Sequence, residues 1–215
     1  MKRILFILLI LTPSLYLFGR DSVSTYYQQG EFISYCSVVT DVPLKVADSV
    51  VDDLISQFRG DPELLFEWAF KDLGKQPGDK SKNEVLIKLK LATFDKMTGK
   101  SLLLTDVIVS EYTTYENVAI ESKVTKTKMN SGKTRVFVDI FYSNALLKKA
   151  YGTFFVVPLD ENRVMMSVQI HVRFGWFFNI FITQKRYRNL VEWRMKGFMN
   201  NMRKEAERRV INREK

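Results

Sequence analysis

His171 is the only histidine in the chain, so it is the first candidate for acid–base chemistry near neutral pH. It stands in residues 163–174, where polar and apolar side chains alternate. This alternation predicts a β-strand with one dry and one wet face, and His171 falls on the wet face with Gln169 and Arg173. We therefore expect a solvated surface histidine. No Ser-His-Asp set, Gly-x-Ser-x-Gly motif or glycine-rich phosphate loop accompanies it.

For two acidic residues, the sequence pattern does not determine which face of the strand the side chain occupies. Asp139 shares its strand phase with Phe137 and Phe141, so an inward orientation would place a carboxyl group among aromatic rings, where its pKa would rise and it could act as a catalytic acid or base. The opposite orientation puts Asp139 on the surface. That pattern is cleaner because it turns three β-branched residues inward, namely Val136, Val138 and Ile140. Asp106 shows the same ambiguity.

Metal and thiol chemistry have few residues to draw on. Cys36 is the one cysteine, so the chain has no internal disulfide, and it lies in an apolar run where a small buried hydrophobe is expected. One histidine and one cysteine cannot supply the ligands of a zinc or haem site, and the carboxylates show no clustered spacing. We expect no metal, no cofactor and no catalysis.

The N-terminus has the organisation of a signal peptide. Lys2 and Arg3 precede a short apolar run that Pro13 interrupts before it reaches the length of a membrane-spanning helix. We expect residues 1–20 to be a signal peptide, and residues 21–215 to be a single domain in the periplasm or outside the cell. An uncleaved anchor, which would tether the same domain to the membrane, is the alternative.

The net charge of +9 is concentrated at the C-terminal end, where residues 185–215 contain many more cations than acids. A basic helix is typical of proteins that bind an anionic membrane or nucleic acid. Export argues against nucleic acid as a partner. A solvated polar face on a packed helix is the alternative interpretation.

The hydrophobic patterns predict an α+β chain. After a polar lead-in at residues 21–31, residues 32–40 predict a strand, and residues 41–60 and 61–74 have helical spacing. From residue 84 the period changes to two, and short turns separate about six strands. A long amphipathic helix starts at Tyr187, and its apolar stripe ends at Ala206. Because no crossover helices separate the strands, we expect a meander of antiparallel hairpins.

This order of elements over residues 31–206 resembles the helix-grip fold of the START-like superfamily, which includes polyketide cyclases and lipid-transport proteins. The resemblance rests on element order and on the stretch from Tyr151-Gly-Thr-Phe-Phe-Val-Val-Pro158 through the strand ending at Phe174 to the last helix. It implies a curved antiparallel sheet of about seven strands, two short helices after the first strand and one long C-terminal helix. A cystatin-like cone is the rival, although that fold does not normally close with a long helix.

The resemblance also implies a cavity for an apolar ligand between the sheet and the long helix. Its lining would consist of Met166, Val168, Ile170, Val191, Met195, Phe198 and Met202. Methionine suits an adaptable pocket because its side chain is flexible. Alternatively, these residues form a packed core. On this resemblance we expect an exported, non-catalytic binding protein for a hydrophobic or amphipathic small molecule such as a lipid.

A second surface could act without any cavity. The run from Phe174 to Phe181 is rich in large aromatic side chains and precedes several basic residues. If it is exposed, it would contact an anionic membrane or a partner through Trp176, Phe177, Lys185, Arg186 and Arg188. If it is buried, it would close one end of the core. The alternative function is therefore an envelope-associated interaction protein with a packed core, acting through its basic helix and aromatic segment.

Overall fold

The structure is a computed structural model that describes residues 21–71, 86–110, 113–143, 147–175 and 183–212. Its strands are β1 (Ser22–Gln28), β2 (Glu31–Thr40), β3 (Leu86–Asp95), β4 (Lys100–Ser110), β5 (Thr113–Lys128), β6 (Thr134–Ser143), β7 (Leu147–Pro158) and β8 (Val164–Phe174). Its helices are α2 (Leu44–Gly60), α3 (Leu64–Glu67) and α5 (Gln184–Ile211). The predicted α+β class and the predicted order of strands and helices are confirmed.

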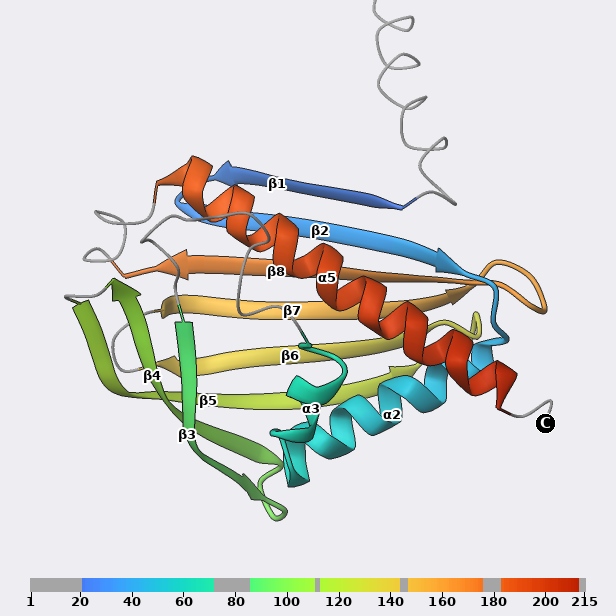
Figure 1. The fold of residues 1–215 in the computed structure, drawn as a ribbon, viewed down its shortest axis with the longest axis horizontal. Helices are drawn as coiled ribbons and strands as arrows, with labels where there is room; N and C mark the ends of the chain where they lie inside the picture. Colours follow the sequence, from blue (N-terminus) through green and yellow to red (C-terminus); the bar gives the residue numbers. More distant parts are fainter. Residues whose placement is uncertain (1–20, 72–85, 111–112, 144–146, 176–182, 213–215) are drawn as a thin grey trace, which may run out of the picture.

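The strands form one antiparallel sheet in the order β1-β2-β8-β7-β6-β5-β4-β3 (Figure 1). From β3 to β8 each strand pairs with the next one in the chain, which confirms the predicted meander. The remaining junction joins distant parts of the chain, because β2 pairs with β8 and Cys36 lies opposite Val168. The first predicted strand and the last one are therefore neighbours.

The sheet described here has eight strands instead of about seven, and the extra one is β1. Its residues were expected to form a polar lead-in, but they pair with β2 through a tight turn at Gln29 and Gly30, whose φ values are 51° and 80°. Positive φ at both central residues is typical of the two-residue hairpin turn that matches the twist of a sheet. The hydroxyl of Thr25 donates to Ser34 at 3.1 Å and ties β1 to its neighbour.

The three helices agree with their predicted ranges to different extents. α2 occupies most of the first predicted range and begins directly after Pro43, which has no N–H to leave unpaired. The second predicted helix shrinks to the single turn of α3. α5 continues past Ala206 to Ile211, and Glu205 accepts hydrogen bonds of 2.8 Å from Arg208 and Arg209 in this last part. These ion pairs stabilise the last turns of α5, beyond the end of its apolar stripe.

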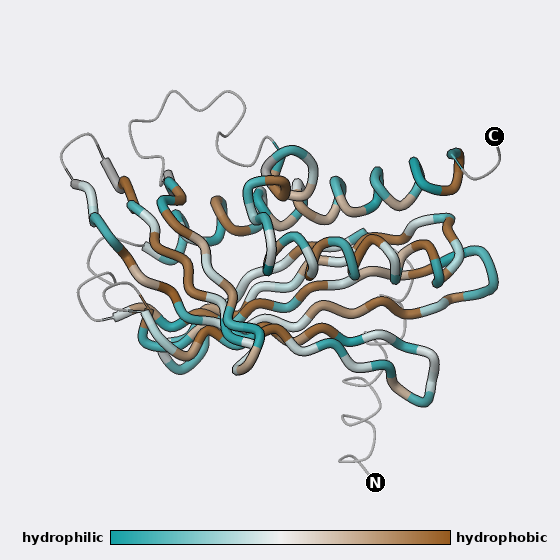
Figure 2. Tube along the Cα trace, turned by 90° about the horizontal axis from the view of Figure 1, so that it is seen from below, coloured by the Kyte–Doolittle hydropathy of each residue, from teal (hydrophilic) through white to brown (hydrophobic). Residues whose placement is uncertain are grey.

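The fold has two layers, with the helices on one face of a curved sheet (Figure 2). We call the face toward the helices the inner face and the opposite one the outer face. α5 crosses the inner face diagonally and ends beside α2 (Figure 1). The core fills the space between the layers and draws side chains from β2, β6, β7, β8, α2 and α5. Among the described residues, no helix is long and apolar enough to span a membrane.

Candidate functional site

The seven residues expected to line a cavity all lie between the inner face and α5. Three of them are completely enclosed, since Met166, Met195 and Met202 have at most 4% of their surface exposed. They share one cluster with Met199 and with the buried side of α2. The end of the interface next to α2 is therefore a packed core, which we call the closed end.

The other four residues are only partly buried and pack against the edge of that cluster: Val168, Ile170, Val191 and Phe198. The change is visible along β8, where Val164 and Met166 are completely buried and every residue from Val168 to Phe174 keeps some exposure. Val138 on β6 is partly buried in the same way. We call these five residues the open part, because their apolar side chains are incompletely covered by the described chain.

An aromatic cluster lies beyond the open part, at the start of α5. The ring of Phe32 lies 4.1 Å from that of Tyr187 and 4.7 Å from that of Tyr27, and Phe174 meets both Phe32 and Tyr187 edge-on. Burial raises the pKa of Tyr187 to about 12, although its hydrogen bond with Ser34 acts in the opposite direction. This cluster joins side chains from β1, β2, β8 and α5.

The segment after α3 reaches α5 and flanks the open part. Phe70 stacks on Phe198 with ring centroids 5.5 Å apart. The Asn201 amide donates to the carbonyl groups of Ala69 and Lys71 at 3.2 and 3.0 Å. These contacts hold residues 69–71 against α5. The partly exposed Phe198 therefore contacts this segment as well as the core cluster.

His171 lies on the outer face, as its phase predicted, but the expectation of a solvated side chain is wrong. Only 17% of its side chain is exposed. Its ring stacks on Tyr151 at 4.4 Å, and its Nδ1 donates to Glu31 Oε1 at 2.7 Å. Glu31 is also 3.6 Å from Lys149 and 3.7 Å from Arg173. Flanking side chains, rather than a second layer, cover this histidine.

The pKa of Glu31 lies below its ordinary value. Burial by itself raises the pKa, but the hydrogen bond from His171 and the charges of Lys149 and Arg173 outweigh that effect. The ionised carboxylate is therefore favoured. Sequence reasoning missed this cluster because Glu31 and His171 meet only through the pairing of β2 with β8.

The structure gives the positions of both acidic side chains whose orientation the sequence left open. Asp139 is exposed on the outer face, whereas Val136 and its alternate neighbours face inward, so the cleaner pattern is confirmed. Asp106 pairs with Lys90 at 2.8 Å, and this hydrogen bond lowers the pKa of Asp106. Cys36 is 1% exposed in the core, as expected, and burial raises the pKa of its thiol to about 11.

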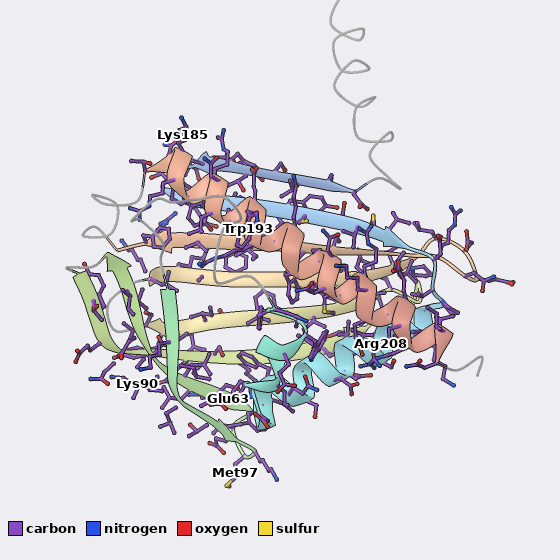
Figure 3. The ribbon with its side chains drawn as sticks, in the orientation of Figure 1. Glu63, Lys90, Met97, Lys185, Trp193 and Arg208 are labelled. Carbon is purple, nitrogen blue, oxygen red and sulfur yellow. The ribbon has the colours of Figure 1, made fainter. Side chains whose placement is uncertain are left out.

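The predicted membrane or partner contact is described only in part. Trp176 and Phe177 lie outside the described residues. Lys185 and Arg188 are exposed at the start of α5, and Arg186 is half-buried. Figure 3 shows Lys185 at one end of α5 and Arg208 near the other. In the described ranges, no group of three histidine, cysteine or acidic side chains could hold a metal ion.

No family model matches the chain, and no curated protein matches its sequence. Its fold does match solved structures. The Zhui aromatase/cyclase from Streptomyces sp. R1128 has a TM-score of 0.50 over 84% of this chain and 96% of its own, at 14% identity. A START superfamily protein from Mycobacterium smegmatis scores 0.48 over 82% and 97%, at 13% identity. A fragment of a STAR-related lipid transfer protein from Xanthomonas axonopodis scores 0.47 over 87% and 98%, at 15% identity.

The chain therefore has the START-like, helix-grip fold. The features that define it are an antiparallel sheet whose first and last long strands are neighbours, α2 and α3 inserted after β2, and the long α5 gripped by the sheet. At these identities the likeness extends to the fold alone.

Proposed function

We propose that the protein is an exported, non-catalytic binding protein for a hydrophobic or amphipathic small molecule, such as a lipid, held between the inner face and α5. The observation that carries this proposal is the open part, where Val168, Ile170, Val191 and Phe198 are incompletely buried beside a packed core. Covering apolar surface contributes about 25 cal/mol per Å². A ligand seated there would complete the burial that the described chain leaves unfinished.

The positions of the titratable groups support binding without catalysis. His171 and Asp139 point away from the open part, on the outer face of the sheet. Asp106 forms an ion pair with Lys90. Zhui is an aromatase/cyclase, but none of these three groups lies where it could act on a molecule in the open part. The ligand would be held by apolar contacts and released unchanged.

Export is proposed from the sequence of residues 1–20, which has the charge and apolar pattern of a signal peptide. At the start of α5, Lys185 and Arg188 are exposed next to the aromatic cluster. Cations in this position would favour contact with an acidic partner protein, from which a ligand could enter.

The first experiment is native mass spectrometry of the mature protein from its own host, followed by organic extraction of any bound molecule. We expect a stoichiometric apolar molecule. A bare protein that also fails to take up a fluorescent fatty acid would overturn the binding proposal and favour the interaction protein with a packed core.

A tryptophan in the open part should block binding. We expect Ile170→Trp to weaken the affinity for a fluorescent fatty acid at least tenfold, because the larger ring occupies the ligand's place. The matched control is Gln169→Trp, which adds the same ring to the adjacent position on the outer face. Fluorescence titration gives the affinities, and circular dichroism checks folding. Equal weakening in both variants would contradict the proposed position of the ligand.

A further inference from the structure

The outer face has an unusual organisation over β6 and β7, where cations lie on aromatic rings. Lys133 is 3.9 Å from the ring centroid of Phe155, and Lys149 is 4.7 Å from that of Tyr151. Arg135 lies 5.4 Å from Phe137, and Lys100 of β4 lies 5.0 Å from Phe141. Cations at these distances are attracted by the electron-rich faces of the rings. We call these eight residues the cation–aromatic face.

Most of this positive charge is not neutralised by the protein. In the described part of the chain, Lys100, Lys133 and Arg135 form no ion pair, and neither does the nearby Lys123. Lys149 lies near Glu31, but the same carboxylate also contacts His171 and Arg173. Aromatic rings keep these cations at the surface without cancelling their charge. The face is therefore complementary to an anionic partner.

A hollow of about 370 Å³ adjoins this face, over β4, β5 and β6. It is lined by Lys100, Lys123, Thr125, Phe137, Asp139 and Phe141. Two ammonium groups stand against one carboxylate, so the hollow keeps an excess of positive charge. Phe141 contributes an apolar wall and has 44% of its surface exposed. The two lysines could bind a phosphate group, and the apolar wall could contact a larger apolar body attached to that phosphate.

The position of the face in the fold indicates a flat partner. β7 and β6 occupy the middle of the strand order. Because the sheet curves toward the helices (Figure 2), its outer face is convex. A planar surface can approach the strands in the middle of such a face without meeting the helix layer. Aromatic side chains beside lysine and arginine are typical of the boundary between water and lipid.

We propose that the cation–aromatic face docks on a phospholipid surface that contains anionic lipid, and that the hollow between Lys100 and Lys123 takes a headgroup phosphate. This site is on the opposite side of the sheet from the ligand position proposed above. Neither proposal depends on the other. Docking here leaves α5 and the open part facing away from the bilayer, so the protein would be held at the membrane while its ligand site stays accessible.

The test places a reporter on each layer of the full-length protein. Thr127→Cys puts a thiol on the outer face, opposite Arg135 in the register, and Lys45→Cys puts one on α2. Both positions are exposed, whereas Cys36 is only 1% exposed and should not react. Each thiol carries a nitrobenzoxadiazole dye, whose fluorescence rises in an apolar environment. Residues 1–20 are the same in all variants, so an attachment through them affects both reporters alike.

Vesicles of phosphatidylcholine with about one third phosphatidylglycerol should raise the fluorescence at position 127, and phosphatidylcholine alone should not. Lys100→Gln with Lys123→Gln should weaken the apparent affinity about 25-fold, since each lysine near an anionic surface contributes about fivefold. The control removes two exposed lysines from the helix layer, Lys45→Gln with Lys204→Gln, and should change the affinity less than threefold.

Three results would overturn the proposal. The first is a response at position 45 that equals or exceeds the response at position 127, which would indicate docking through the helix layer or the start of α5. The second is equal weakening by the two pairs of lysine substitutions. The third is saturation of the hollow by soluble glycerol 1-phosphate, seen as amide shifts at Lys123 and Thr125, without any response to vesicles. That last result would identify a site for free phosphate esters.

Discussion

Met199→Ala is expected to lower the free energy of unfolding by about 2–5 kcal/mol, which is the range for removing a large side chain from a core. Met199 is completely buried at the closed end, where it packs with Met195 and Met202. Truncation would leave a cavity that neighbours on two helices and a sheet cannot fill without moving. Urea denaturation followed by circular dichroism gives the free energy of unfolding for each variant.

The matched control for this prediction is Val168→Ala in the open part. Val168 is only partly buried, so its truncation should cost about 1 kcal/mol or less. A large gap between the two variants supports the division into a closed end and an open part. Equal losses would mean that the whole interface is a packed core, and the binding proposal would lose its main support.

Glu31→Gln is expected to destabilise the protein by about 1.5–3 kcal/mol at neutral pH, the range for a hydrogen bond to a charged group. The substitution removes the carboxylate that accepts from His171 and that Lys149 and Arg173 approach. Those three side chains would be left around a neutral amide. Glu116→Gln, at an exposed position of β5, is the control and should change stability by less than about 0.5 kcal/mol.

The effect of Glu31→Gln should depend on pH in a defined direction. The pKa of Glu31 in the folded protein is lower than the ordinary value of 4.5. Its contribution to stability is therefore present above that ordinary value and is lost as the pH falls through the folded pKa. Wild type and variant should differ most near neutral pH and converge at acidic pH. A difference that stays constant from neutral to acidic pH would exclude the proposed role of the carboxylate.

Patterns within single elements were sufficient to predict much of the fold. The alternation in β8 correctly places Val164, Met166, Val168 and Ile170 on the inner face. The apolar stripe of α5 contains Met195, Met199 and Met202, all of which are buried. Both inferences depend on local periodicity, which a sequence displays directly. The order of elements then restricted the topology, because short turns between strands allow little besides a meander.

The errors concern contacts between distant parts of the chain. The polar β1 is a strand because β2 offers it a partner edge, and its own composition does not reveal this. His171 was expected to be solvated because its partner Glu31 lies 140 residues away in the sequence. The cation–aromatic face was missed for the same reason, since Lys100 meets Phe141 only when β4, β5 and β6 lie side by side.

The pairing of β2 with β8 has a consequence for how the chain acquires its structure. Because strands from the two ends of the chain must meet, the sheet cannot be completed until β8 has left the ribosome. Contacts of such long sequence separation are associated with slow folding. Until then β2 and β7 each present an unpaired edge that could join another chain.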